Sequence, residues 1–270
     1  MKITAPIAAS AGILLAALVL TGCSAGALPG TASSSAAGSS SNSSGSGSGS
    51  AAGSSNTGGS GGNSGPTHDY TADDLVAILK KAEATRNLSG TIKDDAQIKA
   101  DLASNPGESL TQTFAASGGQ FEPAACGTIM DSLLDEANKS LADSGYEGAS
   151  LTATSDILNV ASASGGSATA GLLASSKSTM SKLTSQCSTM SVVDGSTTIG
   201  FTISNASATS NANQTFAYEE DITIPGQAAV KTLTIEAQYG NLYIGDVSVS
   251  DPDASRMEAN INAVVAAAKG

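Results

Sequence analysis

The chain has 270 residues, carries a net charge of −12 at pH 7, and contains one histidine and no tryptophan. An acidic surface repels phosphate backbones and anionic lipid headgroups, so this composition argues against nucleic-acid binding and against a polybasic membrane patch. The scarcity of histidine and tryptophan also disfavours His-rich metal sites and aromatic ligand cages.

Residues 1–22 have the pattern of a signal peptide. Lys2 is the only charged side chain among them, and Ile7–Leu20 is an apolar stretch about as long as a signal-peptide core. A membrane-spanning helix needs roughly 20 apolar residues, which is more than this stretch offers. We therefore expect a secretory signal and not a transmembrane anchor.

The signal-like segment ends in Leu20-Thr21-Gly22-Cys23. A branched apolar residue, two small residues and a cysteine at this place resemble the lipobox of bacterial lipoproteins. The resemblance implies that Cys23 becomes the mature N-terminus and that its sulfur carries a diacylglyceryl group. Two acyl chains give the stable membrane anchoring that one chain cannot give. The expected location is the extracytoplasmic face of the cell membrane, and the alternative is an ordinary secretory signal with an unrelated cysteine.

Residues 24–67 form a Ser/Gly-rich segment with 16 serines, 12 glycines and no charged or aromatic side chain. Such a segment cannot bury enough apolar surface to offset its chain entropy, so we expect a disordered linker. A flexible coil of this length has a root-mean-square span of about 33–40 Å. The expected organisation is a signal peptide over 1–22, a lipidated cysteine with a linker over 23–67, and one domain over 68–270.

The domain begins with a helical pattern. Thr71-Ala72-Asp73-Asp74 is a variant of the capping box, and apolar residues follow it at helical spacing, which predicts a helix over 72–86. The signal is mixed between 88 and 121, where Leu88, Ile92 and Ile98 suggest short strands and 110–114 alternates as a strand does.

A second helix is expected to begin at Pro123, because proline is favoured at the first helical position. Its apolar stripe extends to Leu141, and Gly145 suits the end of the helix. Residues 148–161 suggest a strand. A third helix is predicted over 167–186, with one apolar face.

The last third of the chain changes from helical periodicity to a period of two. Alternating apolar residues predict strands around 199–203, 216–224, 233–239 and 242–244, separated by the turn dipeptides at 194–195, 225–226 and 240–241. Asp251-Pro252-Asp253 then begins a final helix. The predicted fold is therefore an α+β domain in which an antiparallel C-terminal meander packs against helices.

Cys126 and Cys187 remain once Cys23 is assigned to the lipid anchor. In an exported protein two such cysteines favour one disulfide, which stabilises the fold by about 4 kcal/mol when it closes a loop of about 62 residues. A thiol nucleophile lacks a general base, since His68 lies at the junction of linker and domain. The sequence has no Cys-x-x-Cys motif, so redox and zinc sites are not expected.

Glu219-Glu220-Asp221 is the densest acidic run of the chain. In a strand, Glu219 and Asp221 face one way and Glu220 the other, so we expect a solvated sheet face and not a cation site. Asp251-Pro252-Asp253 is expected to begin a helix and not to bind a ligand. The chain contains no EF-hand loop, no phosphate-binding loop and no nucleophile motif. We therefore predict no metal, no cofactor, no catalytic residue and no enzymatic activity.

A second resemblance concerns the domain itself. It is carried by Phe121-Glu122-Pro123-Ala124-Ala125-Cys126 before a helix, by a second cysteine after a later helix, and by the Tyr239-Gly240-Asn241-Leu242 turn. Together these features resemble exported sensor-like domains of actinobacteria, similar to the extracellular sensor domain of mycobacterial Ser/Thr kinases. The kinase sensor domains usually carry two disulfides, whereas this chain offers one pair of cysteines and no kinase domain.

The resemblance implies a binding or sensor-like module of the cell envelope, whose partner is a small molecule or an envelope protein. Two other functions stay open at this point. One is a lipid or glycolipid carrier with an apolar cavity, and the other is an envelope hydrolase. The sequence does not identify the ligand-binding residues of the module.

Overall fold

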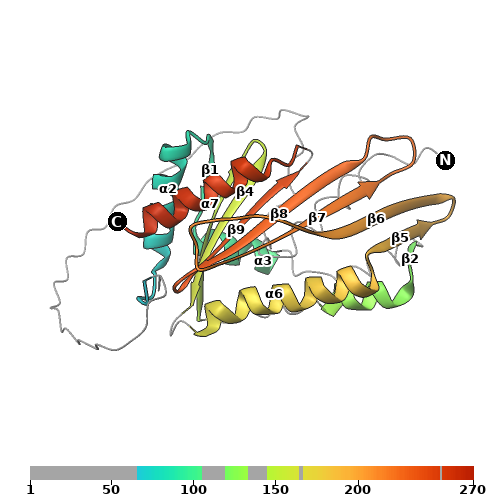
Figure 1. The fold of residues 1–270 in the computed structure, drawn as a ribbon, viewed down its shortest axis with the longest axis horizontal. Helices are drawn as coiled ribbons and strands as arrows, with labels where there is room; N and C mark the ends of the chain where they lie inside the picture. Colours follow the sequence, from blue (N-terminus) through green and yellow to red (C-terminus); the bar gives the residue numbers. More distant parts are fainter. Residues whose placement is uncertain (1–65, 105–118, 133–144, 164–166, 250) are drawn as a thin grey trace.

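The structure is a computed structural model that describes residues 66–104, 119–132, 145–163, 167–249 and 251–270 (Figure 1). Several predictions concern residues outside these ranges. They are the signal peptide, the lipidation of Cys23, the linker up to residue 65, the strand over 110–114, and the second half of the helix expected after Pro123.

The centre of the fold is one nine-stranded sheet in which all neighbouring strands are antiparallel. The spatial order of the strands is β1-β3-β4-β9-β8-β7-β6-β5-β2. The bounds are β1 Gly90–Lys93, β2 Gly119–Glu122, β3 Tyr146–Ala153, β4 Asp156–Ala163, β5 Thr189–Asp194, β6 Thr197–Ala206, β7 Gln214–Thr223, β8 Val230–Tyr239 and β9 Leu242–Val249. The predicted C-terminal meander is thus confirmed, and its last strand pairs with β4 to extend the sheet.

Helices cover both faces of the sheet. The bounds are α2 Ala72–Arg86, α3 Asp95–Ser104, α6 Ser167–Gln186 and α7 Ala254–Ala268, and residues 124–132 are also helical. α2 and α7 lie together on one side, and α6 lies on the other (Figure 1). Strand β8 shows the division, because Ile235 packs with α7 residues while the next residue, Glu236, bonds to Ser176 of α6.

Local signals set the beginnings of α2 and α7 as the sequence predicted. The Thr71 hydroxyl accepts a hydrogen bond from the Asp74 backbone N–H, and the Asp74 carboxylate accepts one from the Thr71 backbone N–H. Asp253 caps α7 by accepting from the Arg256 backbone N–H at 3.1 Å. The three predicted turns connect β5 to β6, β7 to β8 and β8 to β9, each with a glycine at positive φ.

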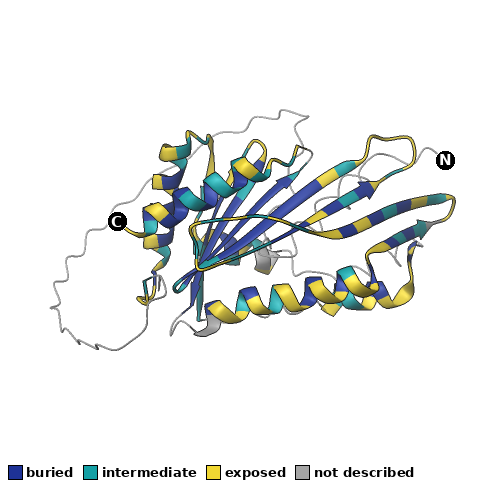
Figure 2. Ribbon diagram, viewed as in Figure 1, coloured by how far each residue is buried: buried dark blue, intermediate teal, exposed yellow. Residues whose placement is uncertain are grey.

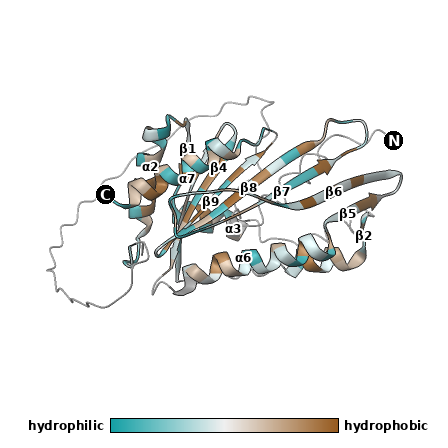
Figure 3. Ribbon diagram, viewed as in Figure 1, coloured by the Kyte–Doolittle hydropathy of each residue, from teal (hydrophilic) through white to brown (hydrophobic). Residues whose placement is uncertain are grey.

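Apolar side chains gather in two main clusters. The first lies between the sheet and the α2–α7 pair and includes buried residues of both. Figure 3 shows hydrophobic residues on these helices and on the central strands. The second surrounds the disulfide and joins the C-terminal half of α6 to β5, β6 and β7. Strands β8 and β9 are buried along most of their length (Figure 2). The far side of β6 is exposed at alternate residues, because α2 and α7 do not cover it.

Four parts of the fold differ from the prediction. Ile98 lies in α3 and not in a strand. The Gln97 backbone N–H donates to the Asp94 carboxylate at 2.9 Å, and the Asp94 backbone N–H donates to the Gln97 side-chain carbonyl at 3.0 Å. This reciprocal pair begins the helix. The single strand expected over 148–161 is a hairpin of β3 and β4 that turns at residues 154–155. Strands β2 and β5 were not predicted; they pair with each other, and Phe121, Met190 and Val192 pack in the disulfide cluster.

Candidate functional site

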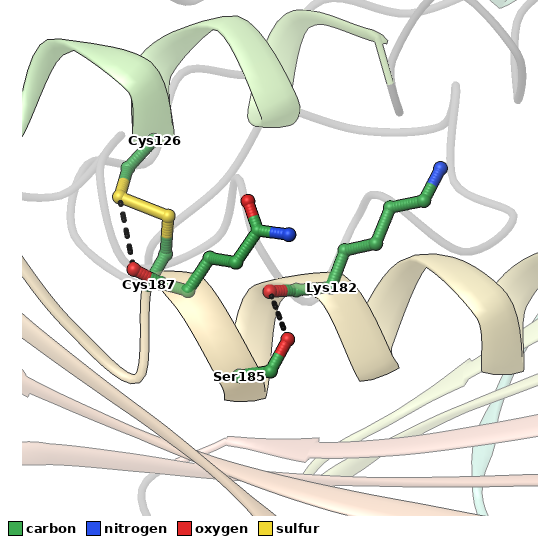
Figure 4. The surroundings of a disulfide bond; sticks show 5 residues. Cys126, Lys182, Ser185 and Cys187 are labelled. Carbon is green, nitrogen blue, oxygen red and sulfur yellow. Dashed lines mark hydrogen bonds between the residues drawn. A yellow bond between two sulfur atoms is a disulfide. The ribbon is translucent and has the colours of Figure 1, made fainter.

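The two cysteines predicted to pair form a disulfide. Cys126 lies in the helical segment 124–132, and Cys187 follows α6; their Cα atoms are 5.7 Å apart. Both residues are buried. Figure 4 shows the bridge beside the last turn of α6, with Cys126 Sγ 4.0 Å from the carbonyl oxygen of Gln186. The predicted pairing is confirmed, and neither sulfur is free to act as a nucleophile.

The acidic run at the end of β7 divides between the two faces of the strand, as predicted. Glu219 is exposed, and Asp221 pairs with Lys231 across 3.5 Å. Glu220 is only 2% exposed, so the prediction of a solvated face is wrong for this residue. Its side of β7 is the α6 side, where Tyr218 and Ile222 are buried in the disulfide cluster.

The other residues singled out from the sequence lie elsewhere. His68 is exposed and its ring packs against that of Tyr70, with the ring centroids 4.3 Å apart. Asp253 caps α7 as expected. Within the described ranges, no three His, Cys, Asp or Glu side chains come together as a metal site would require. None of the described helices is both long enough and apolar enough to cross a membrane.

Six buried polar side chains gather on the α6 side of the three central strands β7, β8 and β9. We call this group, Tyr218, Glu220, Thr232, Thr234, Glu236 and Tyr243, the α6-face polar cluster. All six residues are at most 3% exposed. Four of them bond to one another, Tyr218 with Thr234 and Tyr243 with Glu236. Glu220 Oε1 and Thr232 Oγ1 have no hydrogen-bond partner among the described residues, which is uncommon for buried polar atoms.

Strand register explains why these side chains lie together. Tyr218 on β7 is opposite Thr234 on β8, and Glu220 is opposite Thr232. Directly opposed residues of antiparallel strands point to the same face, so these four share the face that carries Glu236. Burial raises the pKa of Tyr218 well above its usual range, the charges of Glu236 and Glu220 add to the rise, and a hydrogen bond with Thr234 lowers it in part.

Burial controls the protonation of the cluster. It raises the pKa of Glu236 from 4.5 to about 7, and the nearby hydroxyls of Ser176 and Tyr243 lower it in part. Ser176 Oγ donates a hydrogen bond to Glu236 Oε1 at 2.8 Å, and Tyr243 also hydrogen-bonds to the Glu236 carboxyl group. Burial, with the charge of Asp221, raises the pKa of Glu220 well above its usual range. Burial also raises the pKa of Tyr243.

A second buried polar group lies under α7, on the opposite face of the sheet. Arg256 donates two hydrogen bonds to Asp156, at 3.0 and 3.1 Å, and Asn260 donates to Asp246 at 3.0 Å. Arg86 of α2 in turn donates to Asn260 at 3.1 Å. Burial and the Asp156 charge raise the pKa of Asp246 well above its usual range. This network ties α2 and α7 to β4 and β9, and we assign it a structural role.

A hollow of about 380 Å³ lies beside the β6–β7 connection, lined by residues 206–209 and 215–217 and by Glu258. The Glu258 carboxylate there already accepts hydrogen bonds from the Thr209 backbone and hydroxyl, at 2.6 and 3.3 Å. Its one charged side chain is therefore engaged within the protein, and the α6-face polar cluster is the stronger candidate site.

Sequence reasoning did not find the members of this cluster other than Glu220, which it placed in solvent. Glu236 and the two threonines occupy the alternate positions of β8 that an amphipathic strand turns to water. The missed signal was the apolar face of the predicted helix over 167–186, because that face had to cover part of the sheet.

No protein-family model matches the chain. No curated protein matches it. Among solved structures, the chain is similar to the extracellular domain of PknH from Mycobacterium tuberculosis, with a TM-score of 0.44 and 11% identity over 76% of this chain and 100% of that one. A second similar structure is an uncharacterized protein (Rv0999 ortholog) from Mycobacterium smegmatis, with a TM-score of 0.37 and 12% identity over 74% and 100%. At these values the two neighbours carry no argument about ligand or activity.

Proposed function

We propose that the chain is a non-catalytic, sensor-like binding module of the cell envelope and that its ligand is held at the α6-face polar cluster. The observation that supports this proposal is a group of six polar side chains that share one face of the sheet and are at most 3% exposed, among which Glu220 Oε1 and Thr232 Oγ1 have no hydrogen-bond partner within the described residues. Leaving one buried polar atom unpaired costs about 1–3 kcal/mol. A polar ligand that bonds to these two atoms would remove that cost.

The cluster stands on a rigid part of the fold, which suits a binding site. Its residues lie on β7, β8 and β9, and each of these strands is paired on both sides. The disulfide joins the end of α6 to the helical segment 124–132, and Ser176 of α6 bonds to the cluster. A site held in place before binding loses little conformational entropy when the ligand arrives.

The contact between Ser176 and Glu236 resembles a nucleophile beside a base. Ser176 donates to Glu236, and burial brings the pKa of Glu236 to about 7, as a general base requires. Ser176, however, lies in the middle of α6, where the backbone N–H groups are engaged in helical hydrogen bonds. The helix therefore offers no backbone donors for an oxyanion hole, and acyl transfer at Ser176 is disfavoured.

The remaining parts of the proposal rest on the sequence. Lipidation at Cys23 would anchor the chain to the extracytoplasmic face of the membrane, and the linker would hold the domain above it. The partner is a small molecule, with an envelope protein as the alternative. The polar character of the α6-face polar cluster speaks against a lipid or glycolipid carrier, because an acyl chain offers no hydrogen-bond partner to buried polar side chains.

The test is to isolate the full chain natively from a bacterial envelope, denature it, and identify any released small molecule by mass spectrometry. We expect one polar compound in stoichiometric amount. Tyr218→Phe combined with Glu236→Gln should abolish its retention, and Glu219→Gln on the exposed face should not. Release of lipid would favour the carrier. Hydrolytic turnover that Ser176→Ala abolishes, in a parallel screen of ester and glycoside substrates, would overturn the non-catalytic assignment.

A further inference from the structure

A buried carboxyl group lies at the interface between α7 and the sheet. Asp246 is in β9 on the side that α7 covers, opposite Leu158 of β4 and Ile235 of β8. It is 0% exposed, and its carboxyl group accepts a hydrogen bond from the Asn260 amide of α7 at 3.0 Å. Water therefore reaches this group only if α7 moves away from β9.

The charged groups that face Asp246 come from β4, α7 and α2. Asp156 of β4 is 4% exposed and accepts two hydrogen bonds from Arg256 of α7. Arg86 of α2 donates to the side-chain oxygen of Asn260 at 3.1 Å. Neither arginine donates a hydrogen bond to Asp246 itself.

Arg256 is engaged by acceptors other than Asp246. Besides Asp156, it bonds to Ser248 Oγ and to the carbonyl oxygen of Asp251, both at 2.9 Å. The carboxylates of Asp251 and Asp253, at the start of α7, also interact with its charge. Turning Arg256 toward β9 would break these bonds, so it does not serve as the counter-ion of a second buried carboxylate.

These surroundings favour the protonated form of Asp246. Burial, followed by the charge of Asp156, raises the pKa of Asp246 well above its usual range. The Asn260 amide, the charge of Arg256 and the Val247 backbone lower this pKa in part. Ionisation would place a second negative charge beside Asp156 in a site without water, which is costly unless the site opens.

Asn260 connects this carboxyl group to both helices and to two strands. Its side-chain nitrogen donates to Asp246 at 3.0 Å and to Asp156 at 3.4 Å, while its oxygen accepts from Arg86. Asn260 is itself 0% exposed. An ionised Asp246 gains hydration only when the helix that carries Asn260 moves away, so loss of the proton and opening of α7 are linked.

We infer that Asp246 is a pH-responsive latch at the interface of α7 with the sheet: the protonated side chain holds α7 on β9, and its ionisation favours opening of α7. Buried apolar residues of α7, among them Met257, Ile261 and Val264, keep the helix docked in most molecules. The latch therefore sets how often α7 opens and not where it rests. It lies on the opposite face of the sheet from the α6-face polar cluster, so it is independent of the proposed function.

The opening of α7 can be measured by native-state hydrogen exchange of the full chain at pH 5, 6 and 7. Protection factors remove the intrinsic pH dependence of exchange. As long as Asp246 is protonated in the closed state and ionised in the open state, the opening equilibrium constant rises about tenfold per pH unit. We expect the protection of α7 amides to fall by up to about this factor at each step in the wild type.

Variants locate the effect. Asp246→Asn keeps the shape of the side chain and can still accept from Asn260, but it cannot ionise, so the protection of α7 should become nearly independent of pH. Glu258→Gln neutralises a different carboxylate of α7, and Glu236→Gln neutralises one on the other face of the sheet. Both controls should keep the wild-type pH dependence of α7.

Three exchange results would overturn the latch. The first is an unchanged fall of α7 protection with pH in Asp246→Asn. The second is loss of that fall in either control. The third is an equal fall in α7 and in the central strand β7, since α7 would then open only when the whole domain unfolds.

A measurement on the wild type covers the case in which Asp246→Asn fails to fold. The carboxyl carbon of Asp246, followed by carbon-13 NMR, should titrate with a midpoint well above 3.8, its ordinary value. Asp156→Asn should lower this midpoint, because it removes the neighbouring charge and frees Arg256. A wild-type midpoint at or below 3.8 would show that Asp246 is ionised in the closed state, and the latch would then be wrong.

Discussion

The substitution Glu236→Gln should make the stability of the protein less dependent on pH. The introduced glutamine keeps the shape of the side chain and can still accept the hydrogen bond from Ser176, which is 2.8 Å long in the wild type. It cannot ionise. Any change in the pH dependence of unfolding therefore reports on the buried carboxyl group itself.

The sign and size of the effect follow from the pKa of Glu236, which burial raises from 4.5 to about 7. Between these two pH values the folded protein binds more protons than the unfolded chain, so the free energy of unfolding falls as pH rises through this window. One pKa unit corresponds to about 1.36 kcal/mol, so the full loss above pH 7 is about 3 kcal/mol. Between pH 5 and pH 8, the variant should gain about 2.5 kcal/mol relative to the wild type.

The assay is equilibrium unfolding in urea at pH 5, 6, 7 and 8, followed by far-ultraviolet circular dichroism on protein refolded without ligand. Glu220 and Asp246 also have raised pKa values and contribute to the slope of both proteins, so they cancel in the difference. Glu219→Gln on the exposed face is the control and should follow the wild-type curve. An equal difference between wild type and Glu236→Gln at pH 5 and pH 8 would refute the conclusion that Glu236 is buried without a compensating charge.

Three further predictions concern other parts of the molecule. Replacing both Cys126 and Cys187 by serine should lower the free energy of unfolding by about 4 kcal/mol, because the bridge spans a sequence separation of 61 residues; alkylation of the unreduced native protein should label neither cysteine, and labelling of both would contradict the bridge. Arg256→Ala should lower the free energy of unfolding in urea by about 3 kcal/mol, since it leaves the 4%-exposed Asp156 side chain without its cation. Adding Asp156→Asn should recover part of the loss, and no recovery would show that Arg256 acts by packing alone. Cys23→Ala should move the chain from the detergent phase to the aqueous phase in a partitioning assay, and retention in detergent would show anchoring by an uncleaved signal segment.

Local patterns predicted most of the fold, because the residues that begin and end elements act over short distances. The Thr71–Asp74 capping box, the Asp253 cap and the three glycine-containing turns all lie where the sequence placed them. The same kind of signal was overlooked at Asp94 and Gln97, which begin α3. The sequence also predicted the disulfide, since an exported chain with two remaining cysteines has one natural pairing.

The candidate site was beyond such local reasoning. Glu236 is one residue in an ordinary alternating strand, and its burial depends on α6, which begins 69 residues earlier in the chain. Asp246 is likewise a polar residue that is buried because α7 packs over it. A period of two shows which residues share a face, but it does not show whether a helix or water covers that face.

The pairing of β4 with β9 and the packing of α2 against α7 bear on when this domain can fold during biosynthesis. Helix α2 and the 146–163 hairpin find their partners in residues 242–268, far along the chain. A growing chain can therefore not complete its main core until α7 has been made. Folding that depends on such distant contacts is slow. A slowly folding chain remains unfolded longer after synthesis, and this delay is compatible with transport through a narrow membrane channel before the sheet closes.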